Sequence, residues 1–122
     1  MKRIRLELAR DHDFPEGSSR HGYEFVAPLD ANGHIDAEAW KKVRAQCRVV
    51  RFSEGEEDEI GHLVRKPGGF WAFHYYIHGD ADDDESGYRF GSHVFRPGEY
   101  VSIRDQDDRL RAYQVISVQD LG

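Results

Sequence analysis

GFWAFHYYIHG, residues 69–79, is the densest aromatic run in the 122-residue sequence, and it decides the fold class. Its residues alternate between two sets, with the period of two that is typical of a β-strand. One set is aromatic or aliphatic throughout and consists of Trp71, Phe73, Tyr75 and Ile77. The other set consists of Ala72, His74, Tyr76 and His78. We therefore expect a strand whose first face lies in the core and whose second face is free for function.

Similar alternation on both sides of this run predicts further strands. A Pro-Gly-Gly turn at residues 67–69 predicts a tight hairpin that joins residues 60–66 to the aromatic run. Apolar residues at every second position mark strands at residues 3–9 and 23–27, whereas the turn formers of residues 11–22 predict a loop. The remaining predicted strands cover residues 48–52, 88–90, 93–95, 100–104 and 110–118.

One amphipathic helix is predicted over about residues 36–47. Asp36 is a suitable N-cap, and Ile35 and Trp40 have the spacing of a hydrophobic staple. Trp40, Val43 and Cys47 form the apolar stripe of this helix. Roughly seven to eight short strands with one inserted helix predict a mainly β fold. We expect a small antiparallel β-barrel or sandwich, a single domain over residues 1–122, with the helix across one open end.

Charge and composition limit the possible partners. Acidic residues outnumber basic residues 23 to 17, the net charge is −6, and no long basic cluster is present. Because nucleic-acid affinity rests on Lys and Arg side chains that neutralise phosphates, we expect no nucleic-acid partner. No apolar run approaches the roughly 20 residues of a membrane span, and no secretory signal is recognisable. We expect a cytoplasmic protein without a membrane partner, and the sequence leaves monomer and homodimer open.

The sequence contains no recognised catalytic motif. The patterns G-x-S-x-G, G-x-G-x-x-G and the Walker loop are absent. Cys47 is the only cysteine, which excludes an internal disulfide and a Cys-based zinc site within one chain. Its place on the apolar stripe predicts a core side chain rather than a nucleophile. We therefore expect a binding or accessory module rather than an enzyme, and no cofactor.

The polar face of the aromatic run is the predicted binding surface. Histidine and tyrosine side chains meet an acidic rim there, which favours a patch that binds a protein or small-molecule partner. The residues predicted for this patch are His74, Tyr76, His78, Tyr88 and His93.

The alternative interpretation of the same region is a site that binds a divalent metal ion. Asp80, Asp82 and Asp84 begin with the spacing of a calcium-binding loop, but Glu85 and Gly91 occupy the positions that need Gly and Glu. A solvated hairpin loop is the other interpretation of this acidic segment.

Histidines could supply further ligands. The hairpin pairs His74 with residue 62 or 63, so His62 could lie opposite His74, and these two with Asp80 or His93 could bind a metal ion. His74 and His78 lie about 13 Å apart on one strand, too far to share an ion unaided.

Two short stretches resemble known enzyme families. FRPGEYV at residues 95–101 and RAYQ at residues 111–114 resemble the flavin-binding barrel of ferredoxin-reductase-type enzymes, with Gln114 where that flavin motif has Ser. The Pro-Gly strand entry after a group of histidines resembles the cupins, although their His-x-His pair is absent. The cupin resemblance implies a metalloenzyme that would use His62, His74 and a carboxylate.

A broader resemblance covers nearly the whole chain. GYEFVAPLD at residues 22–30, CRVVRF at residues 47–52 and GYRFG at residues 87–91 resemble a small family of uncharacterised bacterial proteins. This resemblance implies a single-domain bacterial protein without an assigned activity, and it transfers no catalytic residue.

Overall fold

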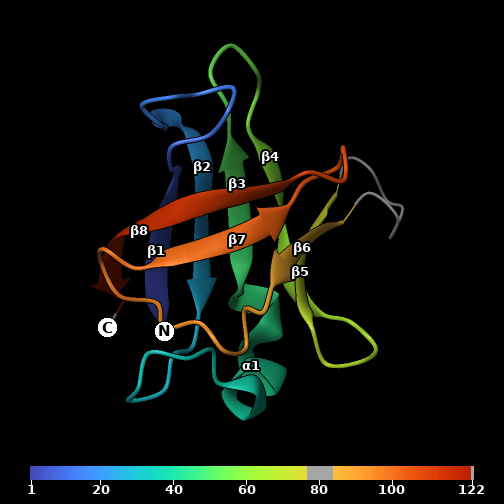
Figure 1. Ribbon diagram of the computed structural model, residues 1–122. Helices are drawn as coiled ribbons and strands as arrows, with labels where there is room; N and C mark the ends of the chain where they lie inside the picture. Colours follow the sequence, from blue (N-terminus) through green and yellow to red (C-terminus); the bar gives the residue numbers. More distant parts are fainter. Residues whose placement is uncertain (77–83, 122) are drawn as a thin grey trace.

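The computed structural model describes residues 1–76 and 84–121, and only the backbone of Tyr88. Over these residues the chain forms a closed barrel of eight antiparallel strands with one short α-helix (Figure 1). The elements are β1 (Lys2–Leu8), β2 (Ser18–Ala27), α1 (Ala37–Val43), the 3₁₀ turn η1 (Arg44–Gln46), β3 (Arg48–Phe52), β4 (Glu59–Arg65), β5 (Trp71–Tyr75), β6 (Glu85–Tyr88), β7 (Tyr100–Arg104) and β8 (Leu110–Asp120). The expected mainly β fold is confirmed, and the sheet closes into a barrel.

Closure depends on the pairing of the first and last strands. Each strand pairs with the next one along the chain, and β8 returns to pair with β1. Lys2 therefore faces Ala27 of β2 on one side and Asp120 of β8 on the other. An ion pair of 3.5 Å between Lys2 Nζ and Asp120 Oδ2 holds the end of this seam. In Figure 1, β7 and β8 cross steeply in front of β1, β2 and β3.

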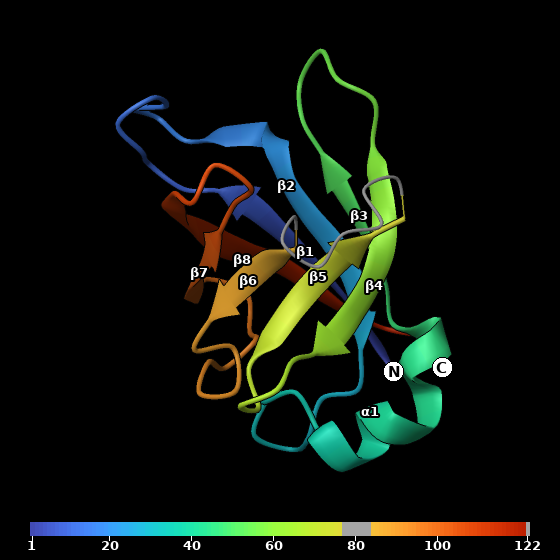
Figure 2. The same cartoon turned by 90° about the vertical axis from the view of Figure 1, so that its right-hand side faces the viewer.

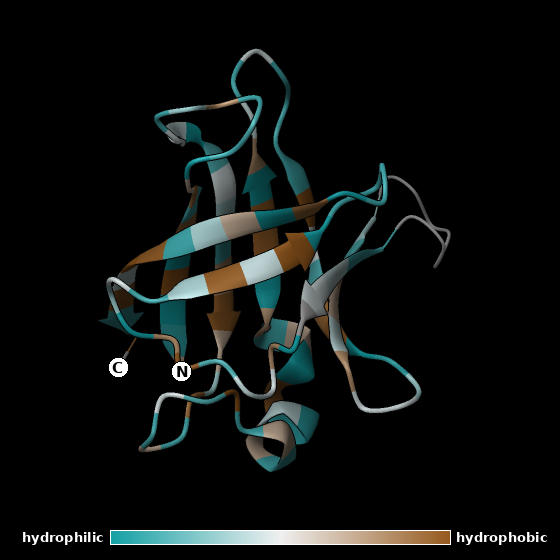
Figure 3. Cartoon of the chain, viewed as in Figure 1, coloured by the Kyte–Doolittle hydropathy of each residue, from teal (hydrophilic) through white to brown (hydrophobic). Residues whose placement is uncertain are grey.

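Alternate side chains fill the barrel. Figure 3 shows hydrophobic and hydrophilic residues alternating along β7, as a strand with one buried face requires. Four phenylalanines form the centre of the core, with ring centroids 5.2 to 6.3 Å apart: Phe25, Phe73, Phe90 and Phe95. The predicted core positions Trp71, Phe73 and Tyr75 are buried. Ile77 lies outside the described residues, and Ala72 of the opposite face is also buried.

The predicted helix is present as α1 and η1, and it covers one end of the barrel (Figures 1 and 2). Asp36 is its N-cap, and the Asp36 carboxylate accepts the backbone N–H of Ala39 at 3.1 Å. The indole N–H of Trp40 donates to the carbonyl of Leu63 at 3.1 Å. The same indole packs edge-on against Trp71, with 5.3 Å between ring centroids. Trp40 therefore fixes the helix to β4 and β5.

β2 is longer than expected. It begins at Ser18, inside the segment 11–22 that was predicted to be a loop. The register between β1 and β2 shifts after Glu7, so Glu7 pairs with Gly22 while Leu8 pairs with Ser18. This bulge extends the pairing into residues whose local composition favours turns.

The chain after β6 also differs from the prediction, because residues 93–95 form no strand. Arg89 has a φ of 54°, in the left-handed region where an extended strand cannot continue. Phe90 then folds back so that its ring covers Gly87, where an added Cβ would lie 2.4 Å from the ring. The missing side chain at Gly87 therefore lets a turn residue fill the core.

Part of the acidic segment is strand rather than solvated loop. Glu85 and Ser86 belong to β6, where they pair with Phe73 and Ala72 of β5. Because Phe73 faces the core, its partner Glu85 faces the core as well. The prediction of a solvated loop was therefore wrong for Glu85.

Candidate functional site

The predicted histidine pair exists. His62 on β4 lies directly opposite His74 on β5, as the hairpin register predicted. The Nε2 atom of His62 is 3.0 Å from the carbonyl oxygen of Ala45, and because a carbonyl only accepts, this nitrogen carries the hydrogen. The Tyr76 hydroxyl donates to the other ring nitrogen, Nδ1, in a close contact. Both nitrogens of His62 are therefore engaged within the protein.

His74 is oriented by a buried carboxylate. Its Nδ1 atom lies 2.6 Å from Oδ1 of Asp84, and Asp84 also forms an ion pair with Lys66. The Asp84 side chain is only 4% exposed, so it is held between two basic groups away from water. Since Asp84 fixes Nδ1 as a donor, Nε2 carries a lone pair in the neutral ring and a second donor in the protonated ring.

A groove of about 480 Å³ lies between the helix segment and the β4–β5 hairpin, and we call it the helix groove. Half of its lining is apolar, and the other half is basic or imidazole: Trp40, Ala45, Leu63 and Val64, then Arg44, Arg65, His62 and His74. Among the residues that the structure describes, no acidic side chain lines it. The guanidinium of Arg65 lies 5.0 Å from the centre of the Trp71 ring, which holds this arginine beside the groove.

Only some of the residues predicted for the metal site are among those that the structure describes. Residues 1–76 and 84–121 contain no group of three or more His, Cys, Asp or Glu side chains that could hold a metal ion. Both ring nitrogens of His62 are occupied, so it could ligate a metal only after breaking a hydrogen bond. His78, Asp80 and Asp82 lie outside the described residues. The divalent-metal site, and the cupin-like activity with it, stays a prediction.

The predicted binding patch is divided between two places. His74 and Tyr76 lie on the hairpin with His62. His93 lies on the loop between β6 and β7, where its backbone N–H donates to the carbonyl of Phe90 at 3.4 Å. Of Tyr88 the structure describes only the backbone, which pairs with Ser102.

A second group of polar side chains lies inside the barrel, at the end away from α1. We call this end of the barrel the barrel mouth. Glu85 is 0% exposed there. The hydroxyls of Tyr23 and Tyr75 donate to its Oε1 atom at 3.0 and 2.7 Å, and Arg51 Nε lies 3.5 Å from the same oxygen. The second oxygen, Oε2, has no hydrogen-bond partner among the described residues. A buried carboxyl with one unsatisfied oxygen is costly and therefore requires an explanation.

The electrostatics of this cluster follow from burial. Burial raises the pKa of Glu85, while the Arg51 charge and the two tyrosine hydroxyls act in the opposite direction. Burial, together with the nearby Glu85, raises the pKa of Tyr23 and Tyr75. Burial also raises the pKa of Tyr113 to about 12. The phenols therefore stay protonated as donors, and a carboxyl with a raised pKa beside a pocket is typical of functional sites.

A pocket of about 180 Å³ occupies the barrel mouth. It shares Tyr23 and Arg51 with the Glu85 cluster, so these two side chains connect the pocket to the cluster. The remaining lining combines apolar and polar side chains: Leu8, Phe14 and Phe52, with His21, Ser53, Asp105, Asp107, Arg111 and Tyr113.

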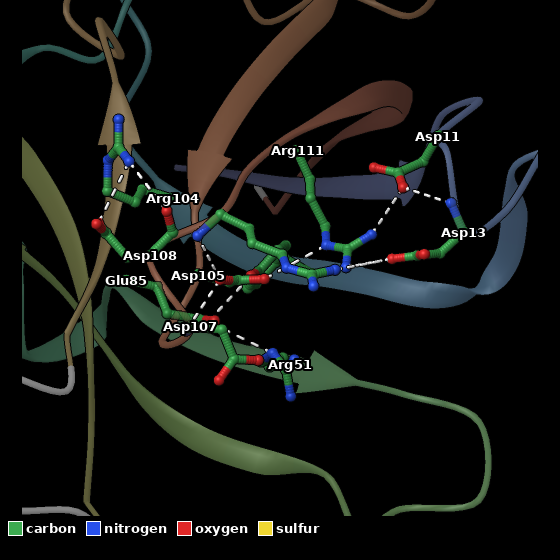
Figure 4. A network of polar contacts seen from close by, with 11 residues as sticks. Asp11, Asp13, Arg51, Glu85, Arg104, Asp105, Asp107, Asp108 and Arg111 are labelled. Carbon is green, nitrogen blue, oxygen red and sulfur yellow. Dashed lines mark hydrogen bonds and ion pairs between the residues drawn. The ribbon is translucent and has the colours of Figure 1, made fainter.

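Arg111 holds the rim of the barrel mouth together, as Figure 4 shows. Its guanidinium pairs with Asp11 and Asp13 of the β1–β2 loop, each at 2.9 Å. It also pairs with Asp105 of the β7–β8 turn at 3.3 Å. Because one guanidinium bridges two loops, Arg111 fixes the shape of the pocket entrance.

Sequence reasoning missed the barrel mouth. Arg51 could have been found, since it shares a strand face with the buried Val49 and period two alone turns it inward. No local signal marked Glu85, because it ends an acidic run that is typical of an exposed loop.

Comparisons with known proteins add no family. A scan against protein-family models, a search of curated proteins and a search of solved structures each found no match. The resemblances to uncharacterised bacterial proteins, to flavin-binding barrels and to cupins therefore stay predictions. In the described part of the chain, no helix is both long enough and apolar enough to cross a membrane.

Proposed function

We propose that the protein is a small β-barrel binding module whose helix groove takes a small molecule with an apolar body and a carboxylate. The observation that carries this proposal is the composition of the groove lining. An apolar floor meets a basic rim, without an acidic lining residue in the described part of the chain, although the net charge of the chain is −6.

The floor supports an apolar ligand body. Leu63 and Trp40 form its base, and the Trp40 indole is held in place by its hydrogen bond to the Leu63 carbonyl. Val64 and Ala45 extend the apolar lining. A volume of about 480 Å³ falls within the range of about 300 to 1,000 Å³ that is usual for small-molecule pockets.

The rim supports a carboxylate. Arg44 and Arg65 are both exposed, and neither has an ion-pair partner among the described residues. Guanidinium groups bind carboxylates through paired, charge-assisted hydrogen bonds, so two arginines without an ion-pair partner among the described residues favour an anionic ligand.

His74 adds a directed donor to this rim. Asp84 accepts from Nδ1, so the protonated ring can donate from Nε2 to a ligand carboxylate. This arrangement retains His74 of the predicted patch, and it adds His62, which was predicted only as a metal ligand, as a wall held by Ala45 and Tyr76.

A ligand titration tests the proposal. Hexanoate, hexanamide and hexylamine share an apolar chain and differ in charge. Monitored by ¹H–¹⁵N NMR, hexanoate should bind saturably and shift the indole N–H of Trp40 and the backbone of Leu63. Hexanamide should bind more weakly, and hexylamine weakest, because the arginines favour an anion.

Two matched arginine variants test whether hexanoate binds in the helix groove. Arg44→Gln should weaken hexanoate binding roughly fivefold to tenfold, the loss expected for one exposed charge-assisted contact. Arg96→Gln removes another exposed arginine, on the β6–β7 loop, and should leave the affinity unchanged. Equal affinities for hexanoate and hexanamide, or shifts that avoid the helix groove, would contradict the proposal.

A further inference from the structure

We infer that the barrel mouth is a second ligand site, built for a small zwitterion such as an α-amino acid with a short side chain. Arg51 would bind the carboxylate of this ligand, and Asp107 would bind its ammonium group. This inference is independent of the helix groove, because the two sites share no lining residue.

Arg51 has unused hydrogen-bonding capacity. It lines the pocket, and its recorded ion pairs are long: 3.4 Å to Glu59 and 3.5 Å to Glu85. Strong guanidinium–carboxylate contacts measure about 2.7 to 2.9 Å, so neither acid binds this group tightly. Tyr113 lines the same pocket, and its hydroxyl is a further potential donor to a ligand carboxylate, whereas the hydrogen of the Tyr23 hydroxyl is already donated to Glu85.

The two acidic residues that line the pocket, Asp105 and Asp107, differ in what they already bind. Asp105 accepts the backbone N–H groups of Asp107 and Arg109 at 2.9 Å each and pairs with Arg111. Arg111 in turn is shared among three aspartates. Asp107 also lines the pocket, yet its carboxylate has no recorded hydrogen bond or ion pair among the described residues. Arg51 and Asp107 are therefore the charged pair that remains for a ligand.

The pocket lining limits the ligand further. Glu85 is 0% exposed and does not line the pocket, so a ligand carboxylate at Arg51 does not contact it directly. Leu8, Phe14 and Phe52 supply apolar walls for a short aliphatic group. At about 180 Å³, the pocket is smaller than the usual range of about 300 Å³ and more, which favours a ligand of amino-acid size.

Amino-acid titrations of the natural chain test the inference. Glycine, L-alanine and L-valine are added to ¹⁵N-labelled protein, with acetate and ethylamine as half-ligands. At least one amino acid should bind with a stoichiometry of one and shift the backbone signals of Gly22, Ser53 and Asp107. Acetate and ethylamine should each bind at least tenfold more weakly, since each meets one charge of the pair.

Two aspartate variants separate the site from its surroundings. Asp107→Asn should weaken amino-acid binding roughly tenfold and leave acetate binding unchanged. Asp108→Asn, on the same turn but outside the pocket lining, should change neither. The groove variant Arg44→Gln should also have no effect. Absence of binding by all three amino acids at millimolar concentration, or equal losses in the two aspartate variants, would overturn the inference.

Discussion

The hydroxyl of Tyr75 on β5 and the carboxylate of Glu85 on β6 are joined by a 2.7 Å hydrogen bond inside the barrel. Tyr23 reaches the same oxygen from β2, and Arg51 approaches it from β3. Four strands therefore meet at a single carboxylate. Glu85 is accordingly a structural centre of the barrel mouth, and its protonation is linked to the stability of the fold.

Glu85→Gln should change the pH dependence of stability. Because the pKa of Glu85 is raised in the folded state, its contribution is fully present below its usual pKa of 4.5 and is lost as pH rises through the folded-state pKa. Gln cannot ionise and keeps the shape. Relative to the natural protein, the variant should therefore gain stability as pH rises from about 4.5 toward 8. Urea denaturation of both proteins across this range gives the difference, and a difference that is independent of pH would contradict the expectation.

Tyr75→Phe should destabilise the protein. The substitution keeps the buried ring but removes the hydroxyl that donates to Glu85 Oε1. That oxygen then keeps the hydrogen bond from Tyr23 and the longer contact with Arg51. Loss of a hydrogen bond to a buried acceptor costs about 1 to 3 kcal/mol. Denaturation of the variant and the natural protein at pH 7 measures this loss of folding free energy. Tyr100→Phe is the matched control, because Tyr100 is 58% exposed and its change should stay within about 0.5 kcal/mol.

Arg111→Gln should lower the Tm by releasing three aspartates at the barrel mouth. The effect should shrink in about 1 M NaCl, since salt screens ion pairs at a partly exposed rim. The hydrogen bond from Arg111 lowers the pKa of Asp13. The contribution of Asp13 is thus present above its usual pKa of 3.8 and is lost as pH falls through the folded-state pKa.

Arg109→Gln is the comparison for Arg111. Arg109 is 62% exposed and has one recorded ion pair, to Asp13 at 3.0 Å. Its replacement should lower the Tm less than Arg111→Gln does. A larger loss for the Arg109 variant would show that the bridge between the two loops does not depend on Arg111.

Cys47 should resist alkylation in the folded protein. Its side chain is 0% exposed, and burial raises the pKa of the thiol to about 11. Iodoacetamide at about pH 8 should therefore react with it slowly, because the thiolate is the reactive form. Reaction should become fast in denaturing urea. Ser92→Cys places a thiol at an exposed position, and that second thiol should react in the folded state.

Period-two alternation predicted most of the fold. It placed Trp71, Phe73 and Tyr75 in the core and His62 opposite His74, because both results follow from strand geometry and a short hairpin turn. The helix was predictable for a similar reason, since its N-cap and apolar stripe are local in sequence.

Long-range pairing set the limit of prediction. Local composition could not show that a bulge extends β2 back to Ser18, or that Phe90 fills the core from a turn. The role of Glu85 depends on Tyr23, which lies 62 residues away in the chain. Burial of a charged side chain becomes visible only when strands from distant parts of the sequence are brought together.

Because β1 pairs with β8, the barrel can close only late in synthesis of the chain. β1 is synthesised before β8, and it obtains its second partner only when β8 has emerged from the ribosome. Until then β1 is an open edge that can pair with strands of other nascent chains. A chaperone or rapid release after translation would shorten this exposure, so stalling before residue 110 should favour aggregation over a soluble intermediate.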